Sequence, residues 1–150
     1  MQESEELFID TYDSITEIEI ESILFTLLPW DRIFLIWDLG SGKSTLVRAL
    51  LRKHFADPEL IVRSPTYTYY QKYSSPNPLI KDIYHFDLYR LESYEDVFLI
   101  GALDILENPK NICLIEWPEI ISHSISPTRR ISITKGIAES RTYTSEIRRK

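Results

Sequence analysis

The feature that most constrains the fold of this chain is a short glycine-containing loop between an apolar run and an amphipathic stretch. The apolar run, Arg32–Trp37, is rich in branched and aromatic side chains, as buried parallel strands are. Apolar residues then recur at helical spacing, at Leu46, Val47, Leu50, Leu51 and Phe55. The pattern predicts a strand, a loop and a helix in succession.

The loop has the composition of a phosphate-binding motif. Its residues are Asp38, Leu39, Gly40, Ser41, Gly42, Lys43 and Ser44. The two glycines let backbone N–H groups turn toward phosphate oxygens, and the start of the following helix favours an anion. Lys43 is expected to reach the β- and γ-phosphates, the Ser44 hydroxyl suits Mg²⁺, and Thr45 follows within the same site. We therefore predict that the chain binds ATP with Mg²⁺.

Trp37 departs from the full signature G-x-x-x-x-G-K-[ST], which has glycine at this position. A bulky residue where the strand enters the loop can tilt the turn or shield the phosphates. We therefore expect nucleotide affinity to depend on Trp37. The alternative is that a glycine-lysine-serine turn occurs here by chance.

Length and charge limit the other classes of protein. A chain of 150 residues predicts one domain, 1–150, with a sizeable core. A net charge of −6 argues against a protein that coats nucleic acid, so any RNA contact is expected to be indirect. The acidic N-terminus has no signal-peptide pattern and no apolar run has membrane-spanning length, which predicts a cytoplasmic protein. Cys113 is the single cysteine and is expected to be a small buried hydrophobe.

The N-terminal region predicts a short edge strand followed by a helix. Leu7–Asp10 suits the strand, and Ser14 and Glu17 have capping-box spacing for a helix start. The helix is expected to end at Pro29, and its apolar face would comprise Ile15, Ile18, Ile23, Leu24, Leu27 and Leu28. Thr16, in the first turn, either contacts an adenine base or is solvated.

After the phosphate-loop helix, Leu60–Val62 suggests a strand that enters an extended segment, 64–73, rich in tyrosine. The tyrosines fit an aromatic sheet surface. A second interpretation gives Thr66 a nucleotide-sensing role, because a hydroxyl beside the γ-phosphate can order when that phosphate is present. Residue spacing alone favours the first interpretation.

Two carboxylates follow predicted strands. Ile80–Asp87 ends in Asp87, and the strand at 111–115 is followed by Glu116. The carboxyl ends of parallel strands face the ligand crevice, so both acids are candidates to hold Mg²⁺ or an attacking water. Asp87 could instead cap the next turn. His85 is expected to be a packed or hydrogen-bonded sheet residue, because its spacing from the other histidines is not that of metal ligands.

The remaining segments complete the fold class. Leu91–Glu107 predicts short helical pieces around Gly101, with Phe98 on their apolar side. Arg129–Lys135 and Arg141–Ile147 alternate and predict an antiparallel hairpin at the sheet edge. We predict an α/β P-loop NTPase fold with a mainly parallel central sheet, flanking helices and antiparallel edge strands.

Five motifs in this order resemble the TsaE family, also called YjeE, of bacterial tRNA threonylcarbamoyladenosine (t6A) biosynthesis ATPases. They are DLGSGKSTLVRALL, SPTYT, YHFDLYRL, IGALDIL and LIEWPE. The resemblance extends from about Thr16 to the C-terminal hairpin, and its HFDLYR and IEWPE motifs are nearly specific to this family. The family normally has glycine where this chain has Trp37.

The resemblance also implies roles for single residues. The family's magnesium ligands correspond to Ser44 and Glu116, and its phosphate-binding lysine corresponds to Lys43. The aspartate of HFDLYR is Asp87 and the threonine of SPT is Thr66. Two further nucleotide contacts are implied: the family's adenosine-contacting threonine falls on Thr16, and the tryptophan beside the acid is Trp117.

The activity that this resemblance implies is weak ATP hydrolysis in support of two partner proteins, TsaB and TsaD. These transfer the threonylcarbamoyl group to adenosine 37 of tRNAs that read codons beginning with A, and ATP would regulate or reset the complex. Two other classes stay open. A non-hydrolysing, nucleotide-gated binding module would keep the partner surface, whereas a small-molecule kinase would need a lid-sized insertion that the sequence lacks.

Lys43→Ala is expected to remove nucleotide binding without unfolding the chain, because a lysine after a glycine turn serves phosphate rather than the core. Titration of a fluorescent ATP analogue, with thermal unfolding of the same samples, tests this expectation. Unchanged affinity in the variant would contradict the phosphate-loop assignment.

Overall fold

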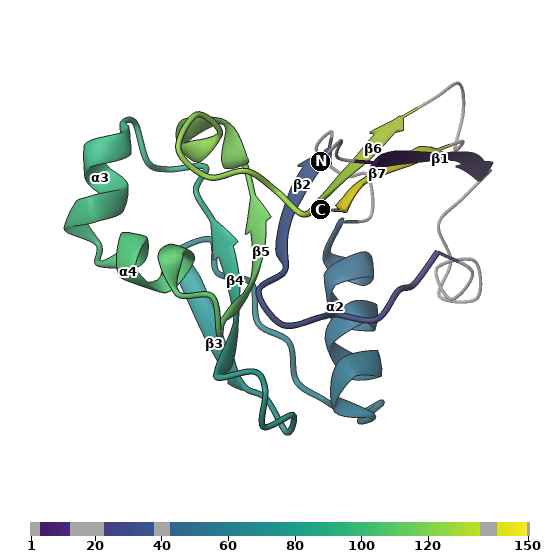
Figure 1. Ribbon diagram of the computed structural model, residues 1–150, viewed down its shortest axis with the longest axis horizontal. Coiled ribbons are helices and arrows are strands. Elements are labelled where there is room, and N and C mark those ends of the chain that lie inside the picture. Colours follow the sequence, from purple (N-terminus) through teal and green to yellow (C-terminus); the bar gives the residue numbers. More distant parts are fainter. Residues whose placement is uncertain (1–3, 13–22, 38–42, 136–140, 150) are drawn as a thin grey trace.

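The computed structural model describes residues 4–12, 23–37, 43–135 and 141–149 (Figure 1). Its strands are β1 (Ser4–Tyr12), β2 (Arg32–Trp37), β3 (Tyr70–Ser74), β4 (Asp82–Asp87), β5 (Ile112–Glu116), β6 (Arg129–Lys135) and β7 (Arg141–Arg149). Its helices are α2 (Lys43–Phe55), α3 (Tyr94–Leu99), α4 (Ala102–Glu107) and the 3₁₀ helix η1 (Pro118–Ile121). The predicted α/β class with an alternation of strands and helices is therefore confirmed.

The strands form a seven-stranded sheet in the order β1-β7-β6-β2-β5-β4-β3. Its centre is parallel, because β2 pairs with both β6 and β5, and β5 pairs with β4, all in parallel. The outer pairs β1–β7, β6–β7 and β3–β4 are antiparallel. Parallel strands share one carboxyl edge, so β2, β4 and β5 all end on the same side of the sheet.

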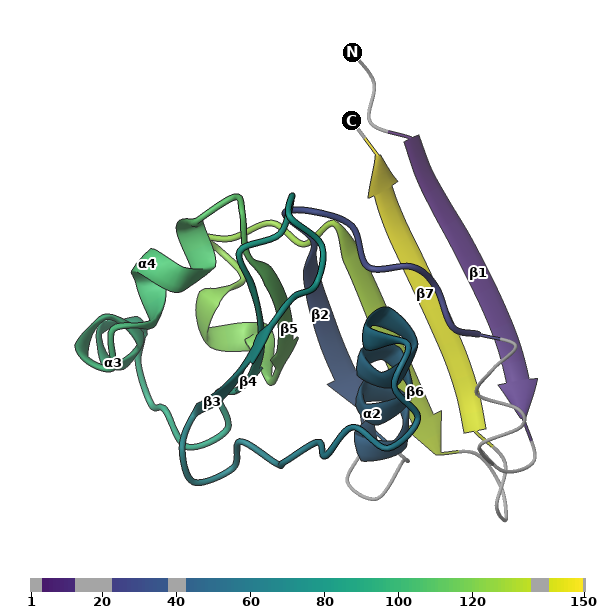
Figure 2. The same cartoon turned by 90° about the horizontal axis from the view of Figure 1, so that it is seen from below.

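Each face of the sheet is covered by helices. Alternate residues of β2 separate the two cores: Ile33 and Leu35 pack with α2, whereas Phe34 packs with α3, α4 and η1. Figures 1 and 2 show α2 on one face and α3 and α4 on the other. Strands covered on both faces are almost continuously apolar, which is why Arg32–Trp37 has no polar alternation.

The predicted C-terminal hairpin forms, but it does not lie at the sheet edge. β6 and β7 pair antiparallel, and β7 then pairs along its whole length with β1, from Tyr12 opposite Arg141 to Ser4 opposite Arg149. Figure 2 shows β1, in purple, as the outermost strand beside β7, in yellow. The expectation was wrong because the N-terminal strand, from a distant part of the sequence, satisfies the outer hydrogen bonds of β7.

The predicted N-terminal helix does not extend to Leu28. The structure describes its last part, residues 23–28, as a turn followed by irregular chain, while residues 13–22 lie outside the described ranges. Ile23 and Leu27 are nevertheless buried against the α2 core. The prediction failed because Ile23 and Leu27, although spaced four residues apart, are buried by an irregular segment. Burial of these side chains does not require a helical backbone.

Leu60–Val62 is also not a strand. Backbone groups at both ends of the segment bond to side chains, since Arg52 Nε donates to the Leu60 carbonyl at 3.1 Å and the Arg63 N–H donates to the Tyr73 hydroxyl at 3.2 Å. The predicted extended segment 64–73 contains a turn, closed by the Thr68 N–H on the Pro65 carbonyl at 3.2 Å. Only its end belongs to β3, at the edge opposite β1.

The helical pieces around Gly101 form as predicted, with Gly101 in the left-handed region at φ 75° between α3 and α4. Val97 and Leu106 are buried, but Phe98 is 65% exposed, so its assignment to the apolar side was wrong. A six-residue helix presents few positions to the sheet, and Val97 takes the inward one. Within the described ranges, no helix has the length and apolar character to span a membrane.

Cys113 is buried in β5, as expected. Burial raises the pKa of its thiol to about 12, because the thiolate would lose solvation. The thiol therefore stays protonated and serves as a small apolar group.

Arg32, at the start of β2, holds the end of α4 and the following turn against the sheet. Its guanidinium is buried and donates to the carbonyls of Leu106 at 2.7 Å, Asn108 at 2.5 Å and Asn111 at 2.5 Å. Cationic donors suit the last carbonyls of a helix, which have no intrahelical partner. This one side chain thus joins β2 to the connection between α4 and β5.

Replacing Arg32 by methionine is expected to lower the free energy of unfolding by about 2–4 kcal/mol, because three main-chain carbonyls lose a charged donor. Lysine at this position should recover only part of the loss, since an ammonium group lacks the planar fork. Urea unfolding measures both variants, with the exposed Lys110→Met as control. A loss below about 1 kcal/mol for Arg32→Met would show that the carbonyls find other donors.

Candidate active site

Asp87 and Glu116 lie side by side at the carboxyl edge of the sheet. They are the last residues of β4 and β5 and are direct register partners. The pairing continues past the strand ends, because the Leu88 N–H donates to the Glu116 carbonyl at 3.1 Å. β2 ends on the same edge, with Leu35 in register with Glu116. The parallel sheet therefore places both carboxylates beside the strand that leads toward α2.

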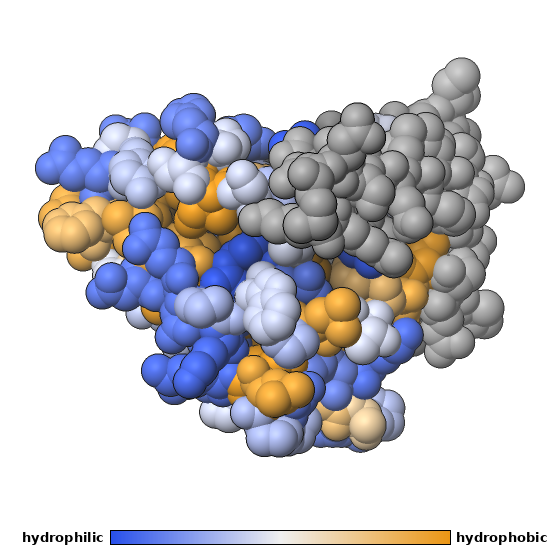
Figure 3. Space-filling view, viewed as in Figure 1, coloured by the Kyte–Doolittle hydropathy of each residue, from blue (hydrophilic) through white to orange (hydrophobic). Residues whose placement is uncertain are grey.

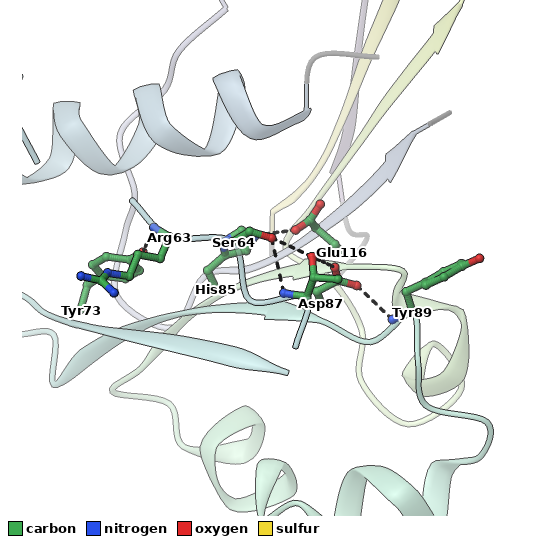
Figure 4. Close-up of polar contacts among 8 residues, drawn as sticks. Arg63, Ser64, Tyr73, His85, Asp87, Tyr89 and Glu116 are labelled. Atoms are coloured by element: carbon green, nitrogen blue, oxygen red, sulfur yellow. Dashed lines mark hydrogen bonds and ion pairs between the residues drawn. The ribbon is translucent and has the colours of Figure 1, made fainter. Parts of the chain in front are cut away.

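A cavity of about 170 Å³ opens between these strand ends and α2. Its lining residues come from α2, the loop before β3, β4 and β5: Val47, Arg48, Val62, Arg63, Ser64, Thr66, His85, Asp87 and Glu116. In Figure 4 the side chains of His85, Asp87 and Glu116 lie around Ser64, on the loop that also carries Arg63. A larger cavity of about 610 Å³ lies along α2 and includes Thr45 and Arg48 but neither carboxylate, so the smaller one is the candidate site.

Asp87 is buried and held by donors on both carboxylate oxygens. The Tyr89 N–H donates to Oδ1 at 3.0 Å, and the Thr66 hydroxyl donates to Oδ2 at 3.4 Å. The Thr66 hydroxyl also lies 2.7 Å from the Ser64 hydroxyl. These contacts fix the orientation of the Asp87 carboxylate and link it to a loop whose own backbone is not part of the sheet.

His85 contacts Glu116 directly: its Nε2 lies 2.7 Å from Oε2. Both side chains are almost fully buried. An ionised carboxylate only accepts hydrogen bonds, so the imidazole donates from Nε2. His85 Nδ1 is buried and has no hydrogen-bond partner in the part of the chain that the structure describes. The histidine is therefore a hydrogen-bonded sheet residue, as expected, and it holds one oxygen of Glu116.

Aromatic side chains border the site at the ends of the same strands. Trp117 directly follows Glu116 with a positive φ of 56°, and its ring centroid lies 5.0 Å from that of Tyr89. Arg90 stacks over the Tyr67 ring at 4.2 Å. The indole of Trp117 is not among the side chains that line the cavity.

The donor set of the cavity suits a magnesium–phosphate ligand. Arg48 and Arg63 supply cationic donors of the kind that bind phosphate, while Asp87 and Glu116 supply the oxygen ligands that Mg²⁺ prefers. Groups of three or more acidic, histidine or cysteine side chains that could hold a metal do not occur in the described ranges. Mg²⁺ shared with nucleotide phosphates takes only one or two carboxylates, so these residues fit it.

The sequence predictions for this site have different outcomes. The structure brings together Thr66, Asp87 and Glu116 around one cavity, whereas Thr45 in α2 lines the larger cavity and not this one. Lys43 and Ser44 are the first residues of α2, and Trp37 ends β2, but their side chains lie outside the described part of the chain. Also outside it are Thr16, Asp38, Leu39, Gly40, Ser41 and Gly42.

Sequence analysis missed the contributions of His85, Ser64 and the two arginines. One signal was available for His85, because residues two apart on a strand share a face, and His85 precedes Asp87 by two positions. Its contact with Glu116 depends on the β4–β5 register, which a single sequence does not reveal. For Arg48 and Arg63 the sequence contains no comparable signal.

Comparisons with known proteins agree with the fold and the motifs. The family model for threonylcarbamoyl adenosine biosynthesis protein TsaE matches residues 9–145. The chain is 40% identical over 101 residues to the TsaE protein of Rickettsia typhi, covering 67% of this chain and 66% of that protein. It is 44% identical over 89 residues to the TsaE protein of Haemophilus influenzae, covering 58% of this chain and 51% of that protein. The match thus spans half to two thirds of these relatives' length.

The fold is similar to a solved structure, the crystal structure of YdiB from Bacillus subtilis. The TM-score is 0.61 with 20% sequence identity, and the match covers 98% of this chain and 88% of that one. At this identity the likeness concerns the fold alone.

The substitutions His85→Leu and Glu116→Ala are expected to give non-additive losses of stability, with a coupling of about 1–3 kcal/mol. The reason is that each substitution removes the buried hydrogen-bond partner of the other side chain. Chemical unfolding of the two single variants and the double variant measures this coupling. His54→Leu is the matched control, since His54 bonds to Ser75 outside the site at 3.0 Å and should be additive with Glu116→Ala. Additivity for His85 as well would refute the contact.

Proposed function

The chain belongs to the TsaE family, and from this premise we propose that it is a Mg²⁺-dependent ATP-binding protein with weak ATPase activity in t6A biosynthesis. In this proposal it acts with TsaB and TsaD, which form t6A at position 37 of tRNAs reading codons that begin with A. ATP binding and hydrolysis by this chain regulate or reset that complex. Contact with tRNA is indirect, in keeping with a net charge of −6.

The observation that carries the proposal is the pair of buried carboxylates, Asp87 and Glu116, in register beside the strand that precedes α2. Phosphoryl transfer to water needs little covalent chemistry from the protein. It needs positioning of phosphate, metal and water, and neutralisation of the charge that develops on the phosphoryl oxygens. At this sheet edge two oriented carboxylates can position metal and water, and two neighbouring arginines can neutralise phosphate charge.

We assign phosphate binding to the backbone of residues 38–42 and to Lys43, with Thr45 beside them. Ser44 and Glu116 would hold Mg²⁺, which neutralises phosphate charge when bound. The His85 hydrogen bond keeps one Glu116 oxygen oriented, so that the carboxylate needs little reorganisation when the nucleotide arrives. Thr16 and Trp117 are assigned to the nucleoside end of the ligand, on the strength of the family motifs.

Asp87 is proposed to orient the attacking water and to accept its proton. Its two oxygens accept from the Tyr89 N–H and the Thr66 hydroxyl, which fixes the plane of the carboxylate. Thr66 is proposed to sense the γ-phosphate: its hydroxyl bonds to Ser64 and Asp87, and it can exchange these partners for a phosphate oxygen. Binding and loss of the γ-phosphate would thereby alter the loop before β3.

The test is ATP turnover by the purified chain, alone and with the TsaB–TsaD pair, together with t6A formation on tRNA. We expect slow hydrolysis, t6A formation that requires this chain, and a fall in kcat of about 100-fold or more in Asp87→Asn with nearly unchanged ATP affinity. Glu59→Gln, at an exposed position after α2, serves as control. Full t6A formation without this chain, or Asp87→Asn turning over as the wild type does, would contradict the proposal.

A further inference from the structure

Three large apolar side chains are exposed together on the short helix α3. Tyr94 is 38% exposed, Phe98 65% and Leu99 71%. Tyr94 and Phe98 are four residues apart and therefore share a helix face, which Leu99 extends at the C-terminal end. Figure 3 shows hydrophobic side chains, in orange, over α3 at the left of the molecule. We call these three residues the α3 patch.

The helix that carries the α3 patch is held in place at both ends. A capping box joins Ser93 and Asp96 at its start, and Val97 anchors its inner side in the core. At the other end Gly101, with φ 75°, turns the chain into α4. The apolar side chains are thus presented by a fixed backbone, which lowers the entropy lost when a partner binds.

The segment that carries the α3 patch is acidic. Residues 91–109 contain five acidic residues and no lysine or arginine, and the exposed Arg90 and Lys110 flank this segment. Four of the acids are exposed, namely Glu92, Glu95, Asp104 and Glu107. In Figure 3 hydrophilic side chains, in blue, border the orange cluster. An apolar centre with a charged rim is the usual composition of a protein–protein contact.

The charge of this rim selects among possible occupants. A nucleic acid backbone or an anionic lipid surface would be repelled by four exposed carboxylates. A second copy of this chain, docked through the same patch, would bring two acidic rims together. A protein whose contact surface has an apolar groove bordered by lysine and arginine would match the α3 patch in polarity and its acidic rim in charge.

We propose that the α3 patch is the docking surface for a protein component of the t6A complex, which contributes an apolar groove with a basic rim. This inference rests on the proposed function, since it takes its partners from there. The patch connects directly to the site through residues 88–93, in which the Tyr89 N–H holds Asp87. A partner bound at α3 thus sits on the helix that directly follows the segment orienting a proposed catalytic carboxylate.

The experiment measures the affinity of the full chain for the purified TsaB–TsaD pair, by calorimetry or interferometry, with ATP and Mg²⁺ present. Phe98→Ser and Leu99→Ser are each expected to weaken binding about tenfold or more, as truncated apolar anchors do. Leu79→Ser is the matched control, because Leu79 is 71% exposed at the opposite, amino end of β4. Glu95→Lys should also weaken binding, and added salt should weaken wild-type binding.

Each outcome decides between the two proposals. Phe98→Ser and Leu99→Ser binding the pair as tightly as Leu79→Ser would overturn the α3 docking surface alone. Failure of the wild type to bind the pair, while it still binds a fluorescent ATP analogue, would overturn both the proposed partnership and the docking surface. Self-association of the wild type in sedimentation runs, abolished by Phe98→Ser, would assign the patch to a second copy and overturn the proposal.

Discussion

The parallel pairing of β4 with β5 is the constraint on which the site depends. It makes Asp87 and Glu116 neighbours, brings His85 within 2.7 Å of Glu116, and carries the pairing one residue past the strand ends. A shift of one residue by either strand would turn that strand's acid to the other face, toward α3 and α4. Each strand divides its side chains between the two cores, and this packing holds the register and thereby the geometry of the site.

The segment before β3 is held mainly by hydrogen bonds to side chains, whereas the strands of the sheet are held by main-chain hydrogen bonds. Its ends bond through the side chains of Arg52 and Tyr73, and its centre reaches Asp87 through the hydroxyl of Thr66. Hydroxyl contacts near 3.4 Å are exchanged at lower cost than main-chain ladder bonds. A rigid sheet edge and an exchangeable loop thus face each other across the cavity, an arrangement suited to a ligand-dependent switch.

The two proposals meet at residues 88–93. Asp87 is oriented from this segment, and α3 begins where it ends. Because the backbone of α3 is fixed by its caps and by Val97, a partner docked on α3 can shift residues 88–93, which connect this helix to Asp87. Coupling between partner binding and ATP hydrolysis would then have a physical route through Tyr89.

Local sequence determined the helix α2, the buried strands β2, β4 and β5, the acids at their ends, and the helical pieces around Gly101, because these depend on residue order and apolar periodicity. The sequence could not place β1 beside β7, since that contact joins opposite ends of the chain. Nor could it show that residues 23–28 and 60–62 are irregular, because their apolar side chains are buried without helix or strand backbone. The partnership of His85 with Glu116 and the exposure of Phe98 were decided by tertiary structure alone, through strand register and the choice of which side of a short helix faces the core.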